Sequence, residues 1–148
     1  MKVIGVLRIS ILGAVLAFVM QACGRSGPAP INYGHEQCSH CRMTVSDPHF
    51  GSQLITHKGR VYTFDDAQCL VAFVKEGGVS EADVAGVYLS DYVNGNILLP
   101  AEGLFLLRSE SLKSPMNGNI AAFSTAEDRA AIKEIHGGDE LNWADVLK

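Results

Sequence analysis

The residues best suited to chemistry lie together in one short segment, residues 38–43, with the sequence CSHCRM. Cys38, Cys41 and Met43 place two thiols and a thioether on one loop. Sulfur donors are soft ligands, and they select Cu(I) over hard cations such as Mg²⁺ or Ca²⁺. Because Cu(I) accepts few ligands, such a loop needs at most one more donor from elsewhere in the chain. The segment therefore predicts a Cu(I) site.

Three other interpretations of the Cys38/Cys41 pair stay open on these residues alone. Zinc usually takes four ligands from two Cys/His pairs, so a zinc site would have to recruit Cys69 and a scattered histidine. A thioredoxin-like dithiol needs a strand before the motif and a helix starting on it, whereas a Pro/Gly-rich tether precedes this motif. A disulfide between Cys38 and Cys41 would close a small, strained loop.

Further donors lie outside the segment. Met116 stands in a polar turn, residues 114–118 (SPMNG), which is an unusual place for a core methionine. His49 is retained as an auxiliary ligand, because histidine binds many metals. Cys69 lies on the apolar side of a predicted helix, which favours a buried, inert thiol. Asp65 and Asp66 precede that helix and are expected to cap it.

An internal repeat organises the elements that must position these residues. Residues 59–78 and 118–137 align at a fixed offset, with matching glycine, phenylalanine and alanine positions. Each copy predicts a strand, a capped turn, a helix and a glycine stop, with Asp65 or Asp66 capping the first helix and Thr125 the second. By this repeat, Met116 lies at an edge of the second half and can reach across to the first.

Additional strands complete the predicted fold. Residues 54–56 are predicted to form a hairpin with the strand at residues 61–64. Residues 104–108 are predicted to be the corresponding strand of the second copy, joined to its next strand by a longer connection. Residues 87–89 and 97–99 read as strands between the copies. The order of elements predicts an α+β fold, with half-domains at residues 34–82 and 83–148. Each half is too small for a core of its own, so the two are expected to pack together.

Residues 1–22 have the sequence pattern of a lipoprotein signal peptide. Lys2 and Arg8 precede an apolar run at residues 9–20, which is too short to span a bilayer comfortably. The run ends in MQAC, which resembles a bacterial lipobox with Cys23 as the lipidated first mature residue; an ordinary cleavage site is the alternative. Residues 23–33 form a lipidated tether. In Gram-negative lipoproteins, an Asp directly after the lipidated cysteine tends to retain the protein at the inner membrane. This chain has Gly24 there, which favours the outer membrane.

Composition narrows the class of protein. The chain has 148 residues, 47% hydrophobic and 19% charged, which suits one ordinary domain or two small ones and excludes a disordered tail. Its net charge of −4 argues against nucleic-acid binding. After Cys23, three cysteines remain. An odd number in an oxidising compartment leaves at least one thiol free or coordinated.

Several of these features together resemble the NosL family. They are the lipoprotein signal, the C-x-x-C-x-M motif, residues 64–66 (FDD) with Cys69, residues 114–116 (SPM) and residues 122–123 (AF). The resemblance implies a copper-chaperone lipoprotein, not an enzyme, that supplies Cu(I) to nitrous oxide reductase beside a membrane ABC-type maturation complex. It also implies two similar ββαβ half-domains, a fold likened to organomercurial lyase.

The resemblance also carries over to single residues. Cys41 and Met43 match the family's Cys-x-Met ligands, and Met116 matches the methionine of its Pro-Met turn, while the role of Cys38 stays open. Arg42 and Asn117 stand where glycine is more usual. Zinc is retained as a second metal. The alternatives are a lipid-anchored thiol oxidoreductase using Cys38 and Cys41, and a copper sensor or buffer without a dedicated recipient.

Overall fold

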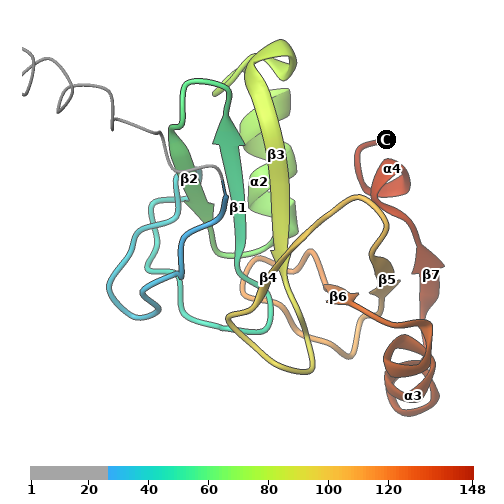
Figure 1. Ribbon diagram of the computed structural model, residues 1–148. Coiled ribbons are helices and arrows are strands. Elements are labelled where there is room, and N and C mark those ends of the chain that lie inside the picture. Colours follow the sequence, from blue (N-terminus) through green and yellow to red (C-terminus); the bar gives the residue numbers. More distant parts are fainter. Residues whose placement is uncertain (1–26) are drawn as a thin grey trace, which may run out of the picture.

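Two antiparallel sheets, each accompanied by a longer helix, make up the computed structural model over the residues it describes, 27–148 (Figure 1). The first sheet has the strand order β2-β1-β3-β4 and the second β6-β5-β7. The first half contains β1 (Ser52–Thr56), β2 (Val61–Phe64), α2 (Ala67–Lys75), the 3-10 turn η2 (Glu81–Asp83), β3 (Val84–Ser90) and β4 (Leu98–Pro100). The second contains β5 (Phe105–Arg108), β6 (Ile120–Phe123), α3 (Ala126–His136), β7 (Asp139–Leu141) and α4 (Trp143–Val146).

The repeat predicted from the sequence is present in the fold. The offset of 59 residues carries Val61, the first residue of β2, onto Ile120, the first of β6. It also carries the helix starts and their N-caps onto each other, Asp66 onto Thr125. In each half the strand that follows the helix returns to the first strand of the hairpin, β3 to β1 and β7 to β5. The predicted α+β fold of two ββαβ units is therefore confirmed.

The first sheet extends further along the chain than the predicted half-domain. β3 pairs with β1 from Val84 to Leu89, and β4 pairs with β3. The predicted division after residue 82 therefore separates both strands from the sheet to which they belong. Strand propensity identified residues 87–89 as a strand, but it does not reveal which hairpin a strand will join.

The two halves share a hydrophobic core. One buried cluster combines Val71 of α2 and Leu89 of β3 with Leu106 of β5 and Ile120 of β6. The first half has a further cluster beneath α2, and the second has one around Phe123. Trp143, the single tryptophan, packs against both the shared cluster and the cluster beneath α2. The expected packing of the halves against each other is thus present.

The halves also join through the backbone. The N–H of Tyr92, just after β3, donates to the Ala122 carbonyl of β6 at 2.8 Å, beside a bridge between Asp91 and Ala122. The predicted signal peptide, residues 1–22, lies outside the described residues, and so does Cys23. None of the helices between residues 27 and 148 has the length and apolar character that a membrane span requires.

The cap of α3 gives a test of the local structure. The Thr125 hydroxyl accepts a hydrogen bond from the Asp128 N–H at 3.1 Å. Thr125→Ala leaves that N–H without a partner, and we expect it to lower the free energy of unfolding by about 1 kcal/mol. Urea unfolding followed by Trp143 fluorescence measures the change. Thr125→Ser keeps the acceptor and is the control; an equal loss in both variants would contradict the role of the cap.

Candidate metal centre

The cysteine motif lies on a loop that the backbone closes on itself. The Cys38 N–H donates to the Met43 carbonyl at 2.8 Å, and the Arg42 N–H donates to the Cys38 carbonyl at 3.1 Å. The Ser39 N–H donates to the Thr63 carbonyl of β2 at 2.8 Å, and this bond fixes the tip of the loop against the first sheet. Both cysteines of the motif are thereby held beside the end of β2, where the chain turns into α2.

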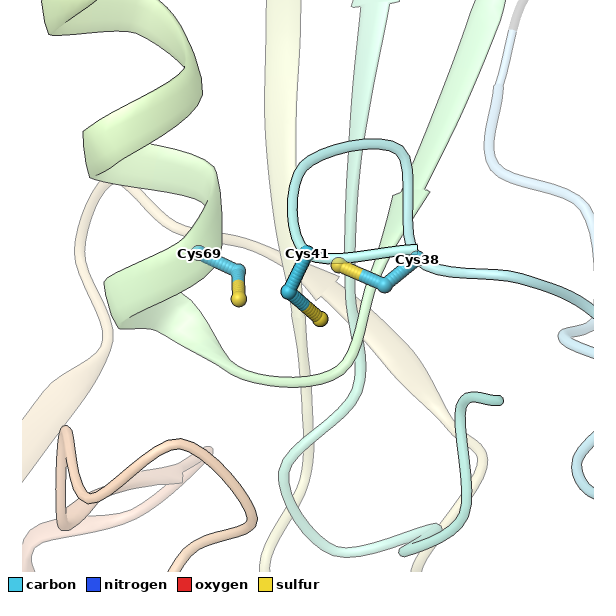
Figure 2. Close-up of side chains that lie close together, drawn as sticks. All are labelled: Cys38, Cys41 and Cys69. Carbon is cyan, nitrogen blue, oxygen red and sulfur yellow. The ribbon is translucent and has the colours of Figure 1, made fainter. Parts of the chain in front are cut away.

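A third cysteine meets them there. The Sγ atoms of Cys38, Cys41 and Cys69 all lie within 4.8 Å of one another. Figure 2 shows Cys38 and Cys41 on the loop and Cys69 on the first turn of α2, with the side chains directed toward one another. All three are free thiols. Among the described residues, no other set of three His, Cys, Asp or Glu side chains is grouped closely enough to hold a metal ion. Three soft donors around one point suit Cu(I).

The thiols differ in acidity because they bond to one another. The Cys69 thiol donates a hydrogen bond to Cys38, and this bond, helped by the Asp65 N–H, lowers the pKa of Cys38 to about 5 against the effect of burial. The same bond, with burial, raises the pKa of Cys69. Burial is the main cause of the raised pKa of Cys41. The hydrogen bonds thus favour a thiolate at Cys38 and neutral thiols at the other two positions, and binding of a metal by all three releases protons.

The methionines take two different positions. Met116 packs against the buried cluster that contains Cys38 and Cys69, so the second half does reach across to the first, as the repeat predicted. Met43 is 57% exposed at the edge of the loop. One thioether thus lies against the core that holds the thiols, and the other faces solvent.

His49 is placed elsewhere. Its Nδ1 lies 2.8 Å from the Tyr92 carbonyl, and its ring packs against the Tyr92 ring with centroids 5.6 Å apart. The structure therefore does not bring this predicted auxiliary ligand into the group of cysteines. Its ring is occupied in joining the loop around residue 49 to the loop after β3.

The two aspartates before α2 do more than the sequence indicated. Asp66 caps the helix as predicted, since its Oδ1 accepts from the Cys69 N–H at 3.1 Å. Its Oδ2 accepts from the Ser114 hydroxyl and from the N–H groups of Met116 and Gly118. Asp65 accepts from the Ser46 N–H at 3.1 Å, and burial raises its pKa. No local signal could have revealed the bonds of Oδ2, because their donors lie about fifty residues away.

Cys69 was expected to be buried, and it is, with 2% of its surface exposed. Its neighbours were not foreseen. A usable signal is its place three residues after the N-cap, because a first-turn side chain stays close to the strand end from which the helix departs. The loop of Cys38 and Cys41 is bound to that same strand, β2.

Arg42 and Asn117, where the resemblance led us to expect glycine, share one backbone feature. Arg42 has φ 66° and Asn117 has φ 58°, both in the left-handed region. Glycine adopts this region without steric cost, whereas most other residues are strained there. Glycine at either position would therefore form the same turn without this cost, which is the physical reason for expecting it there.

Comparison with known proteins identifies the family. The family model of NosL matches residues 28–148. The chain belongs to the NosL family. The predicted resemblance is thereby confirmed over nearly all of the described residues. The crystal structure of the copper chaperone NosL from Shewanella denitrificans has a similar fold, with a TM-score of 0.66 and 21% identity, covering 81% of this chain and 94% of that chain. No curated protein sequence matches the chain significantly.

The strained turn at Arg42 makes a prediction about stability. Arg42→Gly is expected to raise the free energy of unfolding by about 1 kcal/mol, because the cost of a left-handed arginine exceeds the entropy that glycine loses on folding. Asn117→Gly is the matched control and should give a smaller gain, since asparagine tolerates this region. Urea midpoints measure both variants. A loss of stability in Arg42→Gly would show that the arginine side chain contributes more than its backbone costs.

Proposed function

We propose that this chain is an extracytoplasmic Cu(I) metallochaperone that delivers copper for assembly of the copper centres of nitrous oxide reductase. The observation that carries the proposal is the group of three thiols within 4.8 Å in a member of the NosL family. Copper is the cargo, and the protein transfers it without catalysing a reaction. Cys41, Met43 and Met116 are the proposed ligands, and Cys38 and Cys69 offer further thiol donors beside Cys41.

A gradient of exposure across the site supports transfer. Cys38 and Cys69 are buried, Cys41 is half-buried and Met43 is exposed. A donor of a partner protein can therefore reach copper from the side of Cys41 and Met43 while the buried thiols still hold it. Copper then passes through mixed-ligand intermediates and is never released into solution.

The place of the protein in the cell belongs to the same proposal. Cys23 carries the lipid, and the residues that follow it tether the domain. The tether ends earlier than the predicted residue 33, because the Ala29 N–H donates to Oε1 of Gln53 at 3.0 Å and Ile31 is buried in the core. The anchor keeps the domain on the periplasmic side of a membrane, the outer more than the inner. Nitrous oxide reductase and its ABC-type maturation complex are the proposed partners. A tether restricts the search for such partners to the surface of the membrane.

The geometry disfavours the oxidoreductase alternative. A dithiol oxidoreductase attacks with an accessible thiolate. Here the cysteine with the lowered pKa is Cys38, which is fully buried, whereas burial raises the pKa of the more accessible Cys41. The motif also lies in a closed loop and does not start a helix. Three cysteines are likewise one ligand short of a structural zinc site, which takes four, so zinc enters the proposal only as a second metal.

Copper binding is the first test. We expect the full chain in detergent, titrated anaerobically with Cu(I) against a chromogenic chelator, to bind about one equivalent. Cys41→Ser or Cys69→Ser should weaken binding by more than about tenfold, because each removes a donor at the centre of the site. Met43→Ala should weaken binding as well.

His49→Ala is the matched control, because His49 lies apart from the cysteines and its loss should leave the affinity unchanged. Competition with Zn²⁺ in the same titration measures the second metal. Copper that stays entirely with the chelator would contradict the proposal, and so would affinity that no cysteine substitution alters.

Delivery is tested separately from binding. The Cu(I)-loaded chain, mixed with copper-free nitrous oxide reductase and its maturation complex, is expected to restore the reductase's copper content. Cys41→Ser should fail to do so, since it lacks the donor from which copper departs. The control supplies the same amount of Cu(I) from a small-molecule buffer. Equal loading from that buffer would identify the chain as a copper store without a dedicated recipient.

A further inference from the structure

A single buried carboxylate joins the two halves of the protein beside the proposed copper site. Asp66 is only 2% exposed, and each of its oxygens has a different task. Oδ1 accepts from the Cys69 N–H and so begins α2 in the first half. Oδ2 accepts three hydrogen bonds from the turn at residues 114–118 in the second half, at 2.7 Å from the Ser114 hydroxyl and at 3.2 Å from the N–H groups of Met116 and Gly118.

The donors on this carboxylate include the backbone of two sulfur residues. Cys69 supplies a thiol to the cysteine group, and Met116 packs against the cluster in which Cys38 and Cys69 are buried. One rigid group therefore holds the backbone of a thiol donor and the backbone of a thioether donor at a fixed separation. No other side chain of the described residues hydrogen-bonds to the backbone of both.

The turn at residues 114–118 has internal hydrogen bonds and lies close against α2. Within it, the Ser114 N–H donates to Oδ1 of Asn119 at 3.0 Å, and the Asn119 N–H donates to the Ser114 hydroxyl at 2.8 Å, which makes the turn a braced unit. Its approach to α2 is close, since a Cβ atom on Gly118 would lie 2.8 Å from Cβ of Gln68 and 3.1 Å from Oδ2 of Asp66. The turn is therefore held together by its own hydrogen bonds, and the bonds to Asp66 fix its position against α2.

The repeat shows which part of Asp66 is additional to helix capping. Its equivalent in the second half is Thr125, whose single oxygen caps α3. Capping requires only one acceptor. The second carboxylate oxygen, with its charge-assisted bonds to residues 114–118, is present only where the sulfur donors meet.

We propose that Asp66 is the positioning residue of the copper site, and that it fixes Met116 against the cysteines so that the site spans both halves. This inference rests on the proposed function and extends it, because it makes the joint between the halves part of the copper site. A change at this carboxylate then alters copper binding through Met116 without removing any ligand.

The test uses a substitution that preserves the helix cap. Asp66→Ser retains an oxygen for the Cys69 N–H but removes the acceptor for the turn. We expect the Cu(I) affinity of the full chain to fall about tenfold, in the range caused by loss of groups that orient metal ligands. In a Met116→Leu background the same substitution should cause no further loss, because the affected donor is already absent.

A spectroscopic signature separates positioning from general destabilisation. Beyond the predicted signal peptide the chain contains only two methionines, Met43 and Met116. In selenomethionine-labelled Met43→Leu protein processed at Cys23, selenium absorption therefore reports on Met116 alone. We expect scattering from copper at this selenium, and its loss in Asp66→Ser.

Thr125→Ala is the matched control, because it removes the equivalent cap in the other half and should leave both readouts unchanged. Ser114→Ala removes the shortest bond to Oδ2 and should reproduce part of the loss, which keeps the test decisive if Asp66→Ser fails to fold. Three results would overturn the inference. The first is wild-type affinity in both Asp66→Ser and Ser114→Ala, and the second is a fully additive loss when Asp66→Ser is combined with Met116→Leu. The third is the absence of copper scattering at the selenium of Met116 in the protein with Asp66 intact. Cys41→Ser, assayed in parallel, loses affinity in every one of those cases if the proposed function holds.

Discussion

The Asp66 carboxylate imposes the constraint on which the rest of this structure depends. A charged group buried to this degree is costly unless donors surround it. The donors come from two directions, the first turn of α2 and the turn at residues 114–118. The two halves are therefore held in one relative position at the point where the sulfur residues gather, and the shared core around Val71 and Leu106 extends that contact.

Around this joint, protection and access are divided between residues. The Cys69 thiol donates to the sulfur of Cys38, and the backbone N–H of Asp65 donates to it as well, so both favour a buried thiolate there. Met43, on the rim of the loop, is open to a partner. A soft metal ion held here is shielded from water on the inner side and is reachable on the outer side. This division suits a protein that must both bind copper and give it up.

More of the fold than of the site could be predicted from the sequence. A strand followed by a capped helix leaves local traces in propensity, capping residues and glycine stops, and the duplication repeats them, so β2, β6 and the starts of both helices could be predicted. Pairing of β3 with β1 leaves no such trace. At the site, the local motif identified Cys38 and Cys41, and the repeat brought Met116 toward them. The place of Cys69 beside them and the second role of Asp66 depend on segments that are distant in sequence. His49 lies apart from the cysteines because its ring bonds to the Tyr92 carbonyl.

The duplication has produced unequal halves. The position equivalent to Cys69 in the second copy is Asp128, whose carboxylate accepts a hydrogen bond from the capping hydroxyl of Thr125 at 2.7 Å. The second copy has no cysteine on its helix, and what it contributes at the joint is the turn with Met116. A fold with two similar units therefore offers one cysteine cluster per chain rather than two. A recipient that needs several copper ions would have to be filled through successive encounters, so the rate of its assembly would depend on how quickly each empty carrier is replaced.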